Sequence, residues 1–151
     1  MLAYRLPREP SSGRVTVWRK LRRLGAVQIV DGLVTLPRDP RTQEQLEWLA
    51  DQIIEAGGQS NLWFARPATA GEERALQAQM SAAAAEDYQA LIAAINLTLS
   101  EKGSADRRTV ARLTRELDRI RQRDYFPPAE RERAVRALDR LTTVVAEDVG
   151  T

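Results

Sequence analysis

The spacing of hydrophobic residues alternates between helical and extended patterns in the first 66 positions of the chain. In residues 14–24 the apolar side chains recur at steps of three and four, which is one stripe of a 3.6-residue helix. They are Val17, Trp18, Leu21 and Leu24. A second stripe, in residues 40–56, consists of Leu46, Leu49, Ala50, Ile53 and Ile54. The pattern therefore predicts two amphipathic helices.

Short apolar segments flank these helices and predict four strands. They cover residues 2–7, 26–30, 33–36 and 60–66, and a proline or an Asp-Gly pair ends each one. Asp31-Gly32 suits the positive φ values of a type I′ turn, so the second and third strands are predicted to form an antiparallel hairpin. In the last strand, Trp63 and Phe64 should point to opposite faces, one into the core and the other under a helix or at an interface.

Local signals mark where both helices begin. Ser11 or Ser12 is expected to cap the first helix, because a hydroxyl can accept a hydrogen bond from the free amides of the first turn. For the second helix, Asp39-Pro40 offers a cap followed by proline at the first helical position. Thr42 with Gln45 is an alternative capping box.

The predicted order is strand, helix, strand, strand, helix, strand, which is the ferredoxin-like βαββαβ arrangement of the α+β class. Right-handed crossovers would place both helices on one face of a four-stranded antiparallel sheet. We expect this domain to cover residues 1–68. Residues 69–151 predict a helical extension of about three helices packed on it. Ser104 is expected to cap the second of these helices. Tyr125 and Phe126 are expected to staple the last two helices together, and the tail at 147–151 is expected to fray.

The residue types that the sequence lacks narrow its chemistry. Without cysteine there is no disulfide, thiol nucleophile or thiolate metal site, and without histidine the usual general base and the commonest transition-metal ligand are absent. Carboxylate pairs such as Glu72-Glu73 have no such partner. We therefore expect no enzyme, no metal and no cofactor. No apolar run is long enough to span a bilayer and no signal peptide is present, so we expect a cytoplasmic protein.

The net charge of +2 hides a strong asymmetry along the chain. Residues 1–30 hold seven Arg or Lys against one acid, and residues 105–140 hold eleven Arg against seven acids. The first helix contains basic residues and no acid, and such a face can neutralise several phosphates. The candidate nucleic-acid-binding residues are Arg14, Arg19, Lys20, Arg22 and Arg23. A plain solvated helix face is the alternative.

Two further features bear on this surface. A candidate additional basic track consists of Arg107, Arg108, Arg112 and Arg115. The alternative for it is a solvated face that pairs with Glu116 and Asp118. Trp18 lies on the apolar stripe, so we expect it in the core rather than as a platform on which a base stacks.

Several short motifs recur in a known family. They are Arg14-Val-x-Val-Trp-Arg19, Leu24-Gly-Ala26, Ile54-Glu-Ala-Gly-Gly58 and Asp124-Tyr-Phe-Pro127, and they are dense only in residues 4–66. Together they resemble the N-terminal domain of the ChrB-type chromate resistance regulators, a bacterial family. The resemblance implies transcriptional control of chromate export genes, with promoter DNA contacted by the N-terminal region. In that family a separate C-terminal domain is linked to chromate sensing. It has no counterpart here, so we expect a stand-alone relative or a truncated protein.

These observations favour a DNA-associated regulator that uses its basic first helix, with a homodimer as a candidate assembly. The alternative is a non-enzymatic interaction module that docks a separate sensor domain, such as a separately encoded ChrB C-terminal-type domain. The core also resembles Cas2-type nucleases, which need an acid at the end of the first strand to hold a metal. This chain has Leu6, Pro7 and Arg8 there, which speaks against a nuclease.

Overall fold

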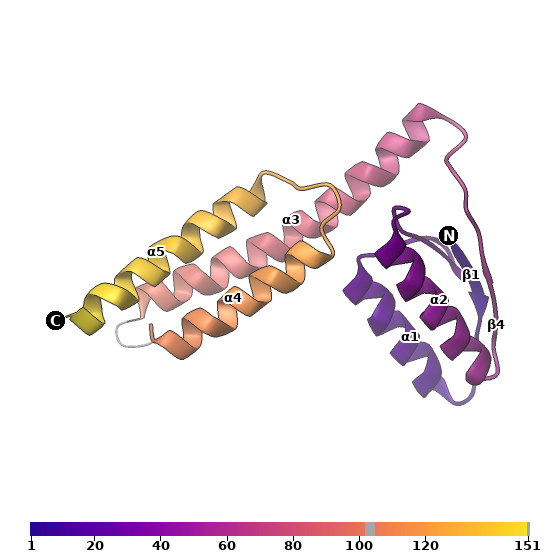
Figure 1. Ribbon diagram of the computed structural model, residues 1–151, viewed down its shortest axis with the longest axis horizontal. Coiled ribbons are helices and arrows are strands. Elements are labelled where there is room, and N and C mark those ends of the chain that lie inside the picture. The colour runs from indigo at the N-terminus through magenta and orange to yellow at the C-terminus, as the bar shows by residue number, and fades with distance from the viewer. Residues whose placement is uncertain (102–104, 151) are drawn as a thin grey trace. The chain divides into compact units, whose positions relative to one another are not determined.

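The computed structural model describes residues 1–101 and 105–150. The chain divides into two compact units, Met1–Gln77 and a second unit that begins at Ala78. The division falls inside the long helix α3 (Ala70–Ser100), which is labelled in Figure 1. The expected domain boundary between residues 68 and 69 lies just before this helix and stays a prediction.

The first unit is a four-stranded antiparallel sheet with two helices on one face (Figure 1). Its elements are β1 (Leu2–Arg5), α1 (Ser11–Leu24), β2 (Val27–Val30), β3 (Leu33–Thr35), α2 (Pro40–Glu55) and β4 (Gln59–Leu62). The strands lie in the order β2-β3-β1-β4, and each neighbouring pair is antiparallel. Leu2 pairs with Val34 on one side and with Leu62 on the other. The predicted α+β class is confirmed.

The core of this unit lies between the sheet and the apolar stripes of the two helices. Leu2 and Val34 are buried on the sheet, and Val17, Leu21 and Ile53 are buried on the helices. The apolar stripe of α2 is narrower than predicted. Ile54 is 56% exposed, whereas the preceding Ile53 is buried. Adjacent helical residues are about 100° apart, so a helix that lies flat on a sheet buries only the centre of its apolar side.

The N-terminal end of α1 differs from the prediction, whereas its C-terminal end agrees with it. Ser11 and Ser12 are the first two residues of the helix rather than caps, and Pro10 precedes them without a side-chain cap. At the other end Gly25 has φ 76° and its amide donates to the Arg22 carbonyl. Glycine adopts this left-handed conformation without a Cβ penalty, so α1 ends where the last apolar residue of its stripe ends.

The cap of α2 is Asp39, as one of the two alternatives predicted. Its Oδ1 accepts from the Thr42 amide at 2.8 Å, and the Asp39 amide donates to Thr42 Oγ1 at 3.1 Å, which completes a reciprocal capping box. The alternative box of Thr42 and Gln45 is wrong. Thr42 is fully buried and also donates to the Pro37 carbonyl, while Gln45 Oε1 is buried without a hydrogen-bond partner.

The hairpin between β2 and β3 forms where Asp31-Gly32 predicted it, but the turn type is different. Only Gly32 has a positive φ, 76°, whereas a type I′ turn needs positive values at both central residues. The Gly32 carbonyl accepts from the Tyr4 amide at 2.7 Å, and a Cβ on Gly32 would lie 2.5 Å from the Tyr4 oxygen. This turn therefore rests directly on β1, and the close approach requires glycine.

Trp63 and Phe64 do not behave as the predicted strand residues. The fourth strand ends at Leu62, and both aromatic side chains are exposed, at 60% and 62%. Neither is in the core, although the Trp63 backbone still pairs with Met1 beyond the end of the strand. The Arg38 guanidinium carbon lies 4.1 Å from the centre of the Phe64 ring, which is a cation–π contact.

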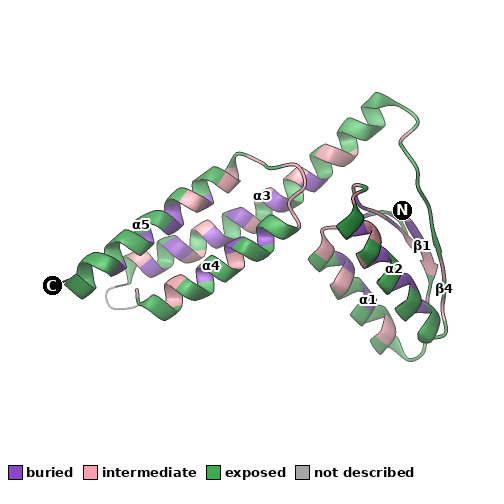
Figure 2. Cartoon of the chain, in the orientation of Figure 1, coloured by how far each residue is buried: buried purple, intermediate pink, exposed green. Residues whose placement is uncertain are grey.

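The second unit consists of the larger part of α3 with α4 (Arg107–Gln122) and α5 (Glu130–Gly150). Figure 2 shows buried residues along the sides on which these helices face one another. The core of this unit forms where α3 packs on the other two helices. From α3 it includes Tyr88, Leu91 and Ile95, and from α4 and α5 it includes Leu113, Leu117, Ile120, Ala134, Ala137, Leu138, Leu141 and Val145. Ala84 is also buried, whereas its neighbour Ala83 is exposed.

Two helix ends also differ from the prediction. The predicted cap Ser104 lies outside the described residues, and the cap of α4 is Asp106, whose side chain accepts from the Thr109 amide at 2.7 Å. The hydrogen bonds that Asp106 accepts from the backbone and the side chain of Thr109 lower the pKa of its carboxyl. At the C-terminal side, α5 continues to Gly150, so residues 147–150 are helical rather than frayed. Tyr125 and Phe126 are half-buried between α4 and α5, and their role as a staple stays a prediction.

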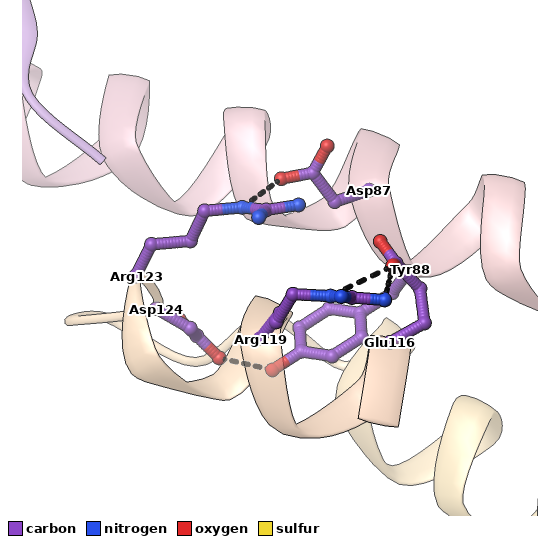
Figure 3. A network of polar contacts seen from close by, with 6 residues as sticks. All are labelled: Asp87, Tyr88, Glu116, Arg119, Arg123 and Asp124. Atoms are coloured by element: carbon purple, nitrogen blue, oxygen red, sulfur yellow. Dashed lines mark hydrogen bonds and ion pairs between the residues drawn. The ribbon is translucent and has the colours of Figure 1, made fainter. Parts of the chain in front are cut away.

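A polar network crosses the core of the second unit (Figure 3). The Tyr88 hydroxyl donates to Asp124 Oδ2 at 2.7 Å, and Arg131 lies 3.8 Å from the same oxygen. The Asp124 side chain is fully buried, and its Oδ1 has no hydrogen-bond partner. Arg123 donates to Asp87 at 2.9 Å. These contacts join residues 36 positions apart and connect α3 to the end of α4.

Candidate nucleic-acid interface

The candidate surface is the outward side of α1. Val17 and Leu21 point into the core, and the helix contains no acidic residue. The four arginines Arg14, Arg19, Arg22 and Arg23 are all exposed. Within the described residues, no ion pair joins any of them to a carboxylate. Their charge is therefore uncompensated at short range, which is the condition an anionic ligand needs.

Lys20 occupies a different position from the four arginines. It is half-buried, and its Nζ donates a short hydrogen bond to Gln52 Oε1 on α2. The predicted basic set is therefore divided by the structure. Lys20 joins the two helices, whereas the arginines remain available on the outward side.

The helix ends add to the electrostatics of α1. Arg22 and Arg23 lie in the last turn, where cations are favoured by the negative end of the helix dipole. This contribution to stability is a structural reason for two of the arginines. It does not account for Arg14 and Arg19, which lie in the first and middle turns. Burial and the charge of Asp31 raise the pKa of the Tyr4 hydroxyl, and the charge of Arg14 opposes them by a smaller amount.

Trp18 is not in the core, contrary to the prediction. Its side chain is 44% exposed, because it lies about 100° around the helix from the buried Val17. Residues four apart are neighbours on a helix surface, so Trp18 lies between Arg14 and Arg22. One signal in the sequence could have indicated this position, because Trp18 is at the margin of a short stripe and has an arginine four residues before it and four residues after it.

The candidate track on α4 is also exposed. Arg107, Arg108, Arg112 and Arg115 form no ion pair with Glu116 or Asp118 among the described residues. Glu116 instead pairs with Arg119 at 2.9 Å (Figure 3). Arg108, Arg112 and Arg115 line one shallow pocket with Asp106, and Arg107 does not. The structure thus keeps three of the four on one side of α4.

Among residues 1–101 and 105–150, no three His, Cys, Asp or Glu side chains come close enough to hold a metal ion. No described helix combines the length and the apolar character needed to cross a membrane.

Comparison with known proteins identifies the family. The family described as "Protein ChrB, N-terminal" matches residues 14–97, which is more than half of the chain and includes all of α1 from Arg14 onward. The chain belongs to the ChrB N-terminal family. It is similar to Protein ChrB of Cupriavidus metallidurans (strain CH34), with 28% identity over 138 residues. The alignment covers 89% of this chain and 42% of that ChrB protein.

This ChrB-family chain therefore spans less than half the length of the ChrB protein that it matches. No solved structure shows a significant match to it. The resemblance inferred from the motifs around α1 is confirmed at the level of the family. The match begins at Arg14, the first of the exposed arginines of α1.

Proposed function

We propose that this chain is a DNA-associated regulatory protein of the chromate resistance type, and that the outward side of α1 contacts phosphates. The observation that carries the proposal is the set of four exposed arginines on a helix without an acid and without an ion pair to the described residues. Arginine suits phosphate because its planar fork can donate two parallel hydrogen bonds. The α4 arginines are proposed as an additional basic track.

The fold supports the proposal without deciding it. We assign the first unit to the ferredoxin-like class, and the strand order β2-β3-β1-β4 with α1 and α2 on one face supports this assignment. In this arrangement one side of α1 is held on the sheet and the other is presented to solvent. A rigid scaffold under a charged face reduces the entropy lost when DNA binds.

The test is a titration of the chain with a duplex from its own upstream region and with a scrambled duplex, each at several salt concentrations. We expect binding that weakens with salt, with a slope of about −0.9 per phosphate contact in a plot of log K against log salt. Arg19→Ala plus Arg23→Ala should weaken binding to both duplexes and flatten the slope by about 2. Unchanged binding by this double variant would remove α1 from the mechanism.

The matched control is Arg133→Ala plus Arg136→Ala, which removes the same charge from exposed positions of α5. If both double variants lose affinity equally, the effect is one of net charge and α1 is not a site. Arg107→Ala plus Arg112→Ala tests the α4 track in the same assay. Tighter binding to the upstream duplex than to the scrambled one would support a promoter as the target.

An interaction module that docks a separate sensor domain is the second candidate. Exposed aromatic side chains favour it, because Trp48, Trp63 and Phe64 each leave about 60% of their surface in solvent. No binding to either duplex at low salt would favour this candidate. A homodimer in the cytoplasm is part of our proposal, and sedimentation at several protein concentrations tests it. We also propose that the chain is not an enzyme, so cleavage of nucleic acid with any divalent metal would contradict the proposal.

A further inference from the structure

Trp18 combines three properties that the phosphate-contact proposal does not use. It is a large apolar ring on the surface, arginines lie four residues before and four residues after it, and 44% of its side chain is exposed to solvent. Lys20, two residues further, is the residue that reaches α2. Two residues correspond to about 200° around a helix, so Trp18 lies on the flank of α1 that faces away from α2.

We infer that Trp18 is a base-stacking contact, and that the α1 surface binds a nucleic-acid strand with unpaired bases more tightly than a perfect duplex. The inference rests on the proposed function, since it assigns a ligand class to the same surface. An indole can stack on a base only where the face of that base is free. In a perfect duplex each base face is already covered by its neighbour.

The flanking charges select nucleic acid over an apolar partner. Arg14 and Arg22 lie on either side of Trp18, and Arg19 lies beside it on the outward face. A strand whose phosphates pair with these arginines would bring its bases to the ring between them. An apolar protein surface placed here would instead bury several unpaired guanidinium groups, which costs free energy.

The chain supplies its own control in Trp48. This tryptophan is also exposed and lies on the neighbouring helix α2, but its helical neighbours Glu44 and Asp51 are acidic. Electrostatic repulsion should keep a phosphate backbone away from it. The two tryptophans therefore differ in the charge around the ring and share residue type and helical setting, with exposed fractions of 44% for Trp18 and 64% for Trp48.

The experiment compares a labelled perfect duplex with the same duplex carrying a central two-nucleotide bulge, by fluorescence anisotropy at one low salt concentration. For the native chain we expect the bulged duplex to bind at least about fivefold more tightly, as expected for one stacked base. Trp18→Ala should reduce this preference to less than about twofold and leave affinity for the perfect duplex nearly unchanged. Trp48→Ala should keep the preference.

Trp18→Leu is the second variant, because it keeps an apolar side chain against the helix margin and lacks a flat ring. It should lose the preference as Trp18→Ala does, with an unchanged far-UV circular dichroism spectrum. In a Trp48→Phe plus Trp63→Phe background, Trp18 is the only tryptophan, since the chain has three. Its emission should be quenched by the bulged duplex and not by the perfect one.

The outcomes separate the two proposals. Salt-dependent binding to the perfect duplex without a preference for the bulge would overturn the role of Trp18 and keep the phosphate contacts of α1. A preference that survives in Trp18→Leu would also overturn it. Equal quenching of Trp18 by both duplexes would contradict the requirement for unpaired bases. No binding to either duplex would contradict the proposed function, and the inference with it.

Discussion

Replacing Tyr88 by phenylalanine removes one hydroxyl from the core of the second unit and leaves the ring in place. The hydroxyl donates to Asp124 Oδ2 at 2.7 Å, and the Asp124 side chain is fully buried. A hydrogen bond to a charged group contributes about 1.5–3 kcal/mol, and its loss leaves a buried acceptor unsatisfied. Asp124 Oδ1 already lacks a partner, and Arg131 is 3.8 Å from Oδ2. We therefore expect Tyr88→Phe to lower the free energy of unfolding by about 2 kcal/mol.

The assay is urea denaturation followed by circular dichroism at 222 nm. With a slope of about 2 kcal/mol per molar urea, the midpoint should fall by about 1 M. Tyr4→Phe is the control, because Tyr4 is half-buried and its hydroxyl forms no hydrogen bond among the described residues. Its midpoint should change by less than about 0.3 M. Equal losses in the two variants, or none in Tyr88→Phe, would refute the view that this hydrogen bond stabilises the fold.

Three further predictions concern pH and local structure. The pKa of Tyr88 is raised by burial, by the hydrogen bond to Asp124 and by the charge of Asp124. The neutral Tyr88 hydroxyl therefore stabilises the fold fully below the ordinary tyrosine pKa of about 10. This stabilisation is lost as the pH rises through the higher pKa of the folded state. Between pH 10 and 12 the native chain should therefore lose more stability than Tyr88→Phe, and absorbance at 295 nm should show one tyrosine that titrates late. Gly58→Ala should lower the free energy of unfolding by about 3 kcal/mol or more, because its Cβ would lie 2.3 Å from the Arg5 oxygen and 2.8 Å from Ile53 Cγ2. Gly57→Ala should lower it by about 1–2 kcal/mol, from the positive φ alone. A thermal denaturation in which Gly57→Ala is the less stable variant would contradict this. Asp39→Ala should cost about 1 kcal/mol through loss of the α2 cap, whereas Asp51→Ala on the same helix should be nearly neutral.

Periodicity predicted which elements form, because the repeat of apolar residues reflects the geometry of a helix or strand directly. The stripe of Val17 and Leu21, the Gly25 helix end and the Asp39 cap all follow from residues close in sequence. The same reasoning failed for Trp18, Ile54 and Trp63. A periodic pattern identifies the apolar side of an element but not how much of that side its neighbours cover.

In the candidate site, too, local features could be predicted and contacts between distant residues could not. The exposure of the α1 arginines followed from their positions outside the buried pair Val17 and Leu21, and the lack of ion pairs within α1 followed from its lack of acids. Both are local properties. The pairing of Lys20 with Gln52 joins residues 32 positions apart, and Tyr88 with Asp124 joins residues 36 apart. No local pattern encodes such contacts, since they depend on which helices become neighbours. The binding of DNA by the arginines stays a prediction.

The order of strands in the first unit has a consequence for the behaviour of the protein at high concentration. β2 and β4 form the two margins of the sheet, and no other strand of the described residues pairs with their outer sides. Their free amides and carbonyls are a template on which another chain can add a strand. Each offers only four residues, but β2 also exposes Ile29 and Val30. Partly unfolded chains should therefore aggregate first through β2, and Ile29→Lys should slow the rise of light scattering in concentrated, partly denatured samples.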